Sequence, residues 1–351
     1  MNKKILLSVV LCLNTFLIFG GNPDRQGEAG AYELLLNPWA RTTGLHAMNT
    51  SFVRGAEAMS LNVAGLTRLG KTEIGIAHSI YLQGTGLGIN TIGFAQRLSE
   101  NGVFGVSINA LDFGKIPVTT NNLPEGTGAT FSPLFFNLAV SYAHSFEKKV
   151  SVGITARFIN ESLADVSASG ISLDAGVQYM TGAEAYPERF KFGISLRNIG
   201  SPMQFGGQGL NQPGTNPDGT LNYSLTYSKN SAQFELPSQL NIGAAYDILP
   251  DAKMRLTAVG NFTSNAFSRD ELGGGLEFGY GNYFMIRGGY KYEVGTTSTD
   301  VNKSVFTGVC GGISVELPFN KSGDQKLSID YGYLATNVFN GTHNLSLRLN
   351  L

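Results

Sequence analysis

Residue types that could carry out chemistry are present in this sequence, but not at the spacing that catalysis or metal binding requires. The four histidines are His46, His78, His144 and His343. None of them belongs to a His-Glu-x-x-His pair, and no Gly-x-Ser-x-Gly nucleophile elbow occurs. Cys12 lies in an N-terminal apolar stretch, so removal of that stretch on export would leave Cys310 alone. This excludes an intramolecular disulfide and a cysteine metal cluster.

Two glycine-containing segments share features with ligand-binding loops. Residues 84–88 read Gly-Thr-Gly-Leu-Gly, but they lie between two predicted strands and lack the helix whose N-terminus would bind a phosphate. Asp218-Gly219 is a turn signal without the remaining ligands of a calcium loop. We interpret both as turns. The sequence therefore predicts no enzyme activity, no cofactor and no metal site.

The composition is unlike that of a soluble protein. Charged residues make up 15% of the 351 positions, against roughly 25% in an ordinary soluble protein, and 45 residues are glycine. A net charge of -1 provides no field for nucleic acid. The mean hydropathy is about zero, and Ile5 to Phe19 is the only apolar stretch of membrane-spanning character. A helical membrane protein is therefore excluded.

The N-terminus predicts a signal peptide at residues 1–21. Lys3 and Lys4 form a positive region, Ile5 to Phe19 form an apolar region, and Gly20-Gly21 supplies small residues for cleavage. A lipoprotein anchor on Cys12 is the alternative, but that cysteine lies inside the apolar region rather than at its end. We therefore expect an exported protein.

After about residue 70 the chain alternates apolar with polar or small side chains, which is the period of a β-strand with two different faces. At the C-terminus, for example, Leu345, Leu347 and Leu349 alternate with Ser346 and Arg348. About fourteen strands are predicted, at 71–82, 86–97, 102–111, 134–146, 149–159, 170–180, 189–198, 236–247, 253–263, 270–280, 283–292, 304–316, 326–335 and 342–351.

The connections favour a membrane barrel over a soluble β-sandwich. Several even-numbered connections are tight turns, whereas the odd-numbered ones include the two longest, 112–133 and 200–235. Short turns at one end, long loops at the other and an even strand count are typical of outer-membrane barrels. A sandwich would carry more charge on its polar face. We predict an all-β fold, a transmembrane antiparallel β-barrel of about fourteen strands over 71–351, multi-pass in the outer membrane and in contact with its lipid.

The polar face of these strands would then line the lumen. Eleven charged residues fall on it by parity: Arg157, Asp174, Lys191, Arg197, Arg255, Glu271, Glu277, Arg287, Lys291, Asp330 and Arg348. Both signs are present, so we expect these groups to pair with one another or with a segment that fills the barrel, because an unpaired buried charge is costly. A substrate-selecting pore is the alternative. By the same parity, His78 and His144 fall on the apolar face.

Residues 22–70 lack the strand pattern. A segment of about fifty residues before the first strand could fold into the barrel as a hatch, or it could form a periplasmic tail. We favour the hatch, because it would satisfy the charged lumen.

The segment contains a recognisable motif. Arg41-Thr42-Thr43-Gly44-Leu45 is followed by Gly55 to Leu66, which ends in Asn-Val-Ala-Gly-Leu. This resembles the N-terminal signature of the PorV/PorQ family, in which Arg-x-x-Gly precedes Asn-Pro-Ala-Gly-Leu by about twenty residues. The motif residues are Arg41, Gly44, Asn62, Ala64, Gly65 and Leu66. Similar elements occur in the hatch of FadL-type fatty-acid transporters, which are fourteen-stranded barrels. Val63 in place of proline and Leu351 in place of a C-terminal aromatic residue depart from these patterns.

The resemblance implies a role in type IX protein secretion, in which such barrels bind the translocon barrel and the C-terminal signal domains of cargo through extracellular loops. Both a PorV-like shuttle and a PorQ-like attachment role fit it. Candidate partner-binding residues lie in the loop 200–235: Pro202, Gln208, Gln212, Asn216 and Asp218. A solvent-exposed loop with no binding role is an equal alternative. The second hypothesis is a FadL-like channel for hydrophobic small molecules, which an apolar tunnel would favour and a lumen of paired charges would oppose. A purely structural barrel is the third.

Overall fold

The computed structural model describes residues 21–182, 186, 188–215, 224–250, 253–281, 283–296, 304–320 and 325–351. Apart from Gly21, the predicted signal peptide lies outside the described residues, and so does Cys12.

Fourteen strands form one closed antiparallel barrel in which the last strand pairs with the first. This confirms the predicted fold class. The barrel strands, in order around the wall, are β1 (Thr72–Tyr81), β2 (Leu87–Arg97), β3 (Gly102–Asp112), β6 (Leu134–Phe146), β7 (Val150–Leu163), β8 (Val166–Thr181), β9 (Phe190–Gly200), β14 (Gln239–Pro250), β15 (Met254–Asn265), β16 (Glu271–Tyr280), β17 (Phe284–Glu293), β18 (Phe306–Pro318), β19 (Lys326–Thr336) and β20 (Thr342–Asn350).

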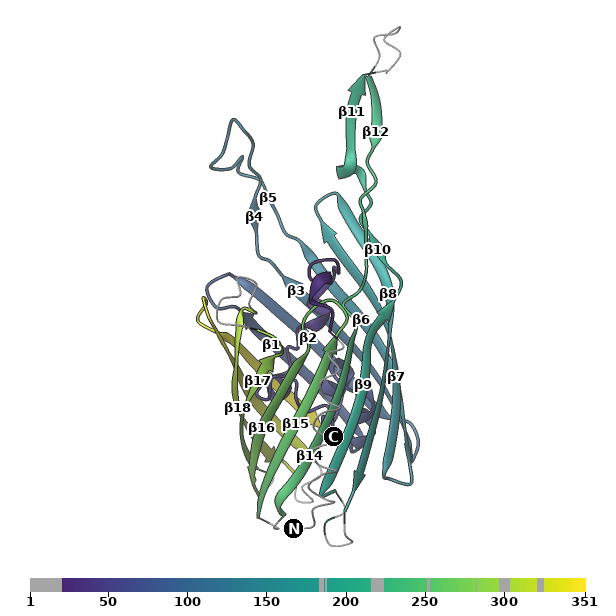
Figure 1. Ribbon diagram of the computed structural model, residues 1–351, viewed down its shortest axis with the longest axis vertical. Helices are drawn as coiled ribbons and strands as arrows, with labels where there is room; N and C mark the ends of the chain where they lie inside the picture. Colours follow the sequence, from purple (N-terminus) through teal and green to yellow (C-terminus); the bar gives the residue numbers. More distant parts are fainter. Residues whose placement is uncertain are drawn as a thin grey trace.

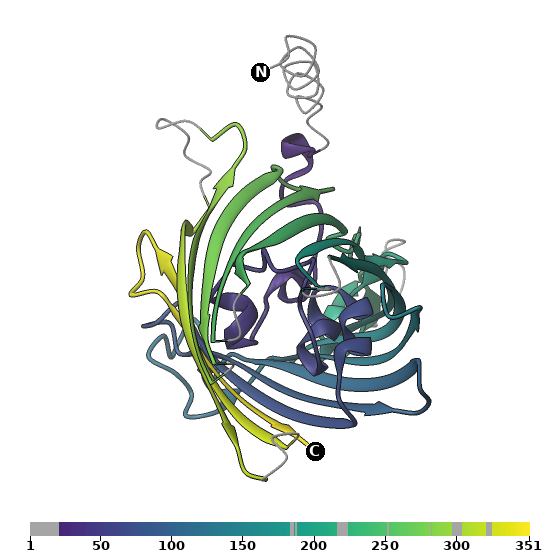
Figure 2. The same cartoon turned by 90° about the horizontal axis from the view of Figure 1, so that it is seen from below.

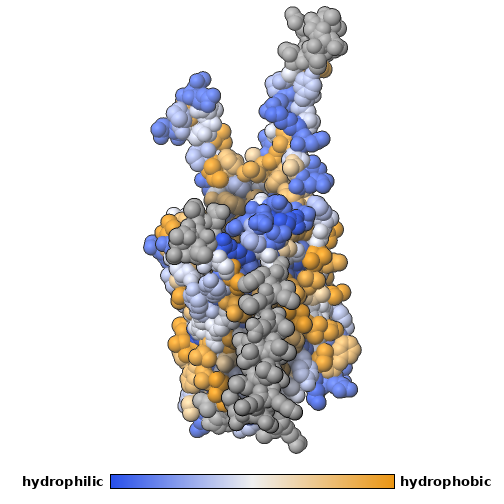
Figure 3. Space-filling model, viewed as in Figure 1, coloured by the Kyte–Doolittle hydropathy of each residue, from blue (hydrophilic) through white to orange (hydrophobic). Residues whose placement is uncertain are grey.

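Side chains along the barrel strands alternate between the lumen and the outer surface. On β1, Ile74, Ile76 and Ile80 are exposed, whereas Glu73 and Ser79 are buried. Apolar residues are prominent on the barrel wall in Figure 3, and hydrophilic ones gather toward the projecting loops. A closed barrel leaves no unpaired strand edge, and its apolar outer surface suits the hydrocarbon layer. The protein is therefore an outer-membrane barrel.

The two ends of the barrel differ, as the loop lengths predicted. β1 begins and β20 ends at the periplasmic rim, which carries the short turns. At the extracellular rim two arms project outward (Figure 1). One contains β4 (Ile116–Pro117) and β5 (Thr130–Phe131). The other, between β9 and β14, contains β10 (Met203–Gln204), η5 (Gln208–Leu210), β11 (Asn211–Thr215), β12 (Ser224–Ser228) and β13 (Gln233–Phe234). The predicted long loops are thus partly two-stranded ribbons.

Residues 29–69, which we call the inner segment, lie inside the barrel (Figure 2). Its helical turns are η2 (Tyr32–Leu35), α2 (Ala40–Thr43), η3 (Ala56–Ser60) and η4 (Val63–Arg68), preceded at the extracellular rim by η1 (Pro23–Arg25). α2 contacts β18, β19 and β20, and η4 contacts β6, β7 and β8. No helix in the described ranges is long and apolar enough to cross a membrane.

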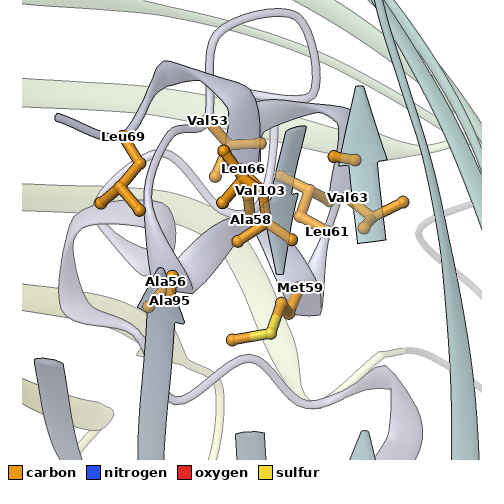
Figure 4. Close-up of a cluster of buried hydrophobic side chains, with 11 residues drawn as sticks. Val53, Ala56, Ala58, Met59, Leu61, Val63, Leu66, Leu69, Ala95 and Val103 are labelled. Carbon is orange, nitrogen blue, oxygen red and sulfur yellow. The ribbon is translucent and has the colours of Figure 1, made fainter. Parts of the chain in front are cut away.

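The inner segment supplies half of the buried apolar residues that the structure describes. Val53, Ala58, Met59 and Leu66 pack together and against the lumen-facing Val103 of β3 (Figure 4). Glycines on the lumen face of the wall make this close packing possible. A Cβ atom at Gly75 would lie 2.8 Å from the ring of Trp39, so a larger residue there would displace the tryptophan.

Candidate functional site

Buried ion pairs surround the inner segment. Nε of Arg348 lies 2.9 Å from Asp330 Oδ2, and Nη2 of Arg348 lies 3.8 Å from Glu316 Oε1. Glu316 in turn accepts from Arg54 of the inner segment at 3.0 Å. Inside the segment itself, Arg41 Nε lies 3.3 Å from Glu57 Oε1. The segment is therefore linked to β18 through Arg54, whose side chain is partly exposed, while buried ion pairs link β18, β19 and β20 to one another.

The wall charges on the other strands are paired in the same way. Glu277 accepts from Arg287 at 3.0 Å and from Arg255 at 2.6 Å. Arg157 donates to Asp174 at 2.9 Å and also to the carbonyl of Met59 in the inner segment at 3.1 Å. Further pairs are Lys191–Asp247 at 2.7 Å and Lys291–Glu271 at 2.6 Å. Ten of the eleven charged residues predicted for the lumen are thus ion-paired, and Arg197 donates instead to the Leu34 carbonyl. This is the arrangement expected to oppose an open apolar tunnel.

The Asn-Val-Ala-Gly-Leu motif consists of Asn62, the N-cap of η4, and the first four residues of that helical turn. The Asn62 side chain accepts from the amide of Ala64 at 3.3 Å and donates to the carbonyls of Thr50 and Val177 at 2.9 and 3.0 Å. Asn62 therefore fastens two stretches of the inner segment to β8. Val63 occupies the first position of η4, where a proline would be preorganised.

The other motif residues act through packing and charge. Gly65 approaches the carbonyl of Val53 so closely that a Cβ atom there would lie 2.1 Å from the oxygen. Its φ is not positive, so close approach rather than an unusual backbone conformation explains the glycine. Leu66 and Ala64 are buried, and Gly44 lies against Gly312 of β18. Arg41 pairs with Glu57, as described above.

The predicted partner-binding residues lie on the arm between β9 and β14. Pro202, Gln208 and Gln212 are exposed there. Asn216 and Asp218 fall outside the described residues. The structure therefore separates the two predicted residue sets, with the motif buried inside the barrel and the loop residues outside it.

A cavity of about 280 Å³ opens at the extracellular mouth, between the inner segment and the wall. Leu35, Leu36 and His46 line it from the inner segment, and Tyr81 and Phe306 line it from the barrel. The His46 ring meets Phe306 edge-on, with ring centroids 5.7 Å apart. No sequence pattern indicates this cavity, because its lining residues come from segments more than two hundred positions apart.

The cavity has a mixed lining, in which apolar side chains such as Leu35, Leu36 and Phe306 alternate with polar ones such as Asn37, Ser79 and Gln239. Burial, together with the nearby Lys291 ammonium, lowers the pKa of His46 to about 4, so the ring is neutral at physiological pH. His46 Nε2 is buried without a hydrogen-bond partner among the described residues. Lys291 itself is paired with Glu271. The site can therefore hold a small molecule against Leu35, Leu36 and Phe306, with polar side chains around it.

A carboxyl pair fastens the inner segment near the same mouth. Glu33 of η2 lies close to Glu161 of β7, and burial followed by the Glu161 charge raises the pKa of Glu33 to about 8. Arg197 Nη2 also donates to the adjacent Leu34 carbonyl at 2.8 Å. A protonated Glu33 can donate to Glu161, whereas two ionised carboxylates repel each other.

This pair predicts a pH-dependent attachment of η2. Because the pKa of Glu33 is about 8 when docked and near 4.5 when undocked, docking is strongest below about pH 4.5 and weakens as the pH rises through 8. Hydrogen exchange of residues 31–36, corrected for the intrinsic rate, should accelerate across that window. Glu33→Gln should flatten the profile, whereas Glu28→Gln at the exposed rim should keep it. An unchanged profile in the first variant would refute the carboxyl pair.

Solved outer-membrane proteins share this fold. The structure of the Pseudomonas putida toluene transporter TodX matches with a TM-score of 0.54 and 11% identity, over 90% of this chain and 97% of that one. The Ralstonia pickettii toluene transporter TbuX matches at 0.53 and 14%, over 89% and 97%. A Pseudomonas aeruginosa FadL homologue matches at 0.51 and 12%, over 89% and 98%. At these identities the likeness shows a FadL-like barrel fold. No protein-family model matches the sequence, and no curated protein matches it significantly.

Proposed function

We propose that this barrel admits small, mainly apolar molecules through its extracellular mouth. The single observation that carries the proposal is the mouth cavity between Leu35, Leu36 and Phe306. The FadL-like fold supports it, since the similar structures include toluene transporters and a FadL homologue. This was the second hypothesis from the sequence.

The size and polarity of the cavity indicate the class of ligand. A cavity of roughly 150 Å³ takes up benzene, so about 280 Å³ accommodates a molecule of one or two rings or a short chain. The polar side chains that share the lining, such as Asn37, Ser79 and Gln239, suit a hydroxyl group on that molecule, because a hydroxyl can both donate and accept a hydrogen bond.

Passage beyond the cavity requires the inner segment to move. Below the mouth, the described part of the lumen is occupied by η3, η4 and their ion pairs. Displacing them would open a path toward the periplasmic end, so we propose that the inner segment acts as the gate.

A disulfide between the inner segment and the wall should block uptake. Thr67 Oγ1 of η4 and Ser151 Oγ of β7 are 2.7 Å apart, so cysteines at these positions would place their sulfurs within bonding reach. In proteoliposomes, oxidised Thr67→Cys/Ser151→Cys should lose passage of toluene or phenol while still binding the ligand at the mouth. Reduction should restore passage.

The single cysteine variants and the native Cys310 provide the controls. Neither single variant can form the bridge, so both should transport with and without oxidant. Unimpaired passage through the oxidised double variant would exclude the gate. Failure of wild-type vesicles to take up any aromatic probe would exclude the channel itself.

A polypeptide-binding role in type IX secretion is the second candidate. The motif from Arg41 to Leu66 supports it, because that motif resembles the PorV/PorQ signature. The charge-paired, occupied lumen supports it as well, since a barrel that binds protein at its surface needs no open path. The β11–β12 ribbon carries no formal charge and projects from the rim (Figure 1), which suits hydrogen bonding to another chain.

Co-purification after gentle extraction distinguishes the two functions. A secretion partner should bring down a large translocon barrel or a cargo signal domain, and shortening the β11–β12 ribbon should remove that partner while the barrel stays folded. Recovery of neither partner from wild-type membranes, together with aromatic uptake in vesicles, would favour the channel.

A further inference from the structure

The lipid-facing wall carries a polar pair within its apolar surface. His78 of β1 and Asn90 of β2 are cross-strand partners, and both side chains point outward. Nδ1 of His78 lies 2.8 Å from Oδ1 of Asn90. With Nδ1 as the donor, His78 Nε2 and the Asn90 amide nitrogen form no hydrogen bond with any residue that the structure describes.

Apolar side chains flank this pair. Ile76 and Ile80 lie on either side of His78 along β1, and Leu345 lies beside it on β20. His78 is three residues before the extracellular end of β1 at Tyr81. At about 3.3 Å per residue along a tilted strand, the pair lies roughly 7–8 Å below the rim. The pair therefore lies near the extracellular end of the lipid-facing wall, among the apolar residues just named.

The pair lies in a groove of about 430 Å³ in the outer wall. Asn90 and Ala110 are shorter than the isoleucines at 92 and 108 next to them, and Leu345 and Leu347 line the groove from β20. The β1–β2 ladder pairs residue for residue from Thr72–Gln96 to Tyr81–Leu87. The groove is therefore a site on the surface of an intact wall.

We propose that this groove binds one acyl chain of an outer-leaflet lipid that carries a hydroxyl group a few carbons from its headgroup. With Nδ1 donating to Asn90, the His78 ring offers an acceptor at Nε2 and Asn90 offers a donor at Nδ2. A hydroxyl group is both a donor and an acceptor, so it complements the two. The apolar walls of the groove bury the chain on either side of that hydroxyl.

A lipid fits this site better than a protein segment does. The groove opens directly onto the hydrocarbon layer, where lipid chains are in contact with the wall at all times. Its volume is that of a site for one small ligand. A stable protein interface would instead need a total buried area of about 1,200 Å² or more.

The proposal is tested with the full-length protein purified in detergent and exposed to two matched lipids. One is a lipid A disaccharide with 3-hydroxytetradecanoyl chains, and the other has the same chains without the hydroxyl groups. Native mass spectrometry counts the lipids that remain bound. A hydrogen bond in a membrane corresponds to about a three- to tenfold change in affinity, so the wild-type protein should retain the hydroxylated lipid at least threefold better.

His78→Leu/Asn90→Leu should abolish this preference, because leucine suits the lipid-facing surface but offers no hydrogen bond. The matched control is Ile286→Leu/Ile313→Leu, another exposed cross-strand pair, which should keep it. Heat modifiability, the difference in SDS-gel migration between unheated and heated samples, checks that both variants remain folded barrels. Equal retention of the two lipids by the wild-type protein, or an unchanged preference in the His78/Asn90 variant, would overturn the proposal.

Discussion

Arg348→Met is expected to destabilise the docked inner segment by about 3–5 kcal/mol, which is the usual effect of leaving a buried charge without its partner. Arg348 is 2% exposed and binds Asp330, which is 0% exposed, through two contacts of 2.9 and 3.2 Å. It also lies near Glu316, which holds Arg54 of the inner segment. Its loss would leave two buried carboxylates short of positive charge.

The only tryptophan in the chain reports on this change. Trp39 is fully buried beside α2 in the docked segment, so its emission should move to longer wavelength when the segment leaves the wall. In a denaturant titration of the detergent-solubilised barrel, Arg348→Met should shift this fluorescence transition to a lower midpoint. Adding Asp330→Asn should recover part of the loss, because it removes the uncompensated charge.

Lys326→Met serves as the matched control. Lys326 also faces Glu316, but at 3.6 Å and on a partly exposed side chain. Exposed ion pairs contribute about 0–1 kcal/mol, so the midpoint of the fluorescence transition should barely change in Lys326→Met. Equal shifts in the two variants would show that the buried pair does not hold the inner segment.

Trp39→Ala is expected to destabilise the docked inner segment by about 3–5 kcal/mol, which is the usual effect of truncating a fully buried large aromatic side chain. The indole fills the space that Gly75 and Gly93 leave on the wall, and a Cβ atom at Gly93 would lie 3.1 Å from it. The barrel strands cannot close over the resulting cavity, because their ladder hydrogen bonds fix their spacing. Residues 37–47 should therefore exchange amide hydrogens faster.

Trp39→Phe tests whether the loss of volume is the cause. Phenylalanine keeps most of the ring contact with the two glycines and should retain most of the protection from exchange. Tyr290→Ala, at a lipid-facing aromatic position of β17, should leave residues 37–47 unchanged. If the amide hydrogens of residues 37–47 exchanged at the same rate in Trp39→Ala and in the wild-type protein, the tryptophan would not anchor the inner segment.

Much of the barrel could be predicted from the sequence. Alternation with a period of two is a local property, and it identified the fourteen strands, the lipid-facing isoleucines such as Ile76 and the lumen-facing charges such as Arg348. The loop lengths predicted which end of the barrel is extracellular, because hairpin turns and long connections can be recognised in the linear sequence. The cost of unpaired charge predicted that the lumen charges would find partners.

The partners themselves, and both candidate binding sites, depended on the tertiary structure. Strand parity places Glu277 and Arg287 on the same face, but only the register brings them within 3.0 Å. Nothing in the sequence around Gly75 indicates that Trp39 packs against it. The mouth cavity joins His46 to Phe306, and the outer groove joins His78 to Leu345 across the closure of the barrel. The face of the strand to which a side chain points follows from the local sequence. Which residues it contacts there depends on how the sheet closes around the inner segment, because that closure brings together residues that are far apart in sequence.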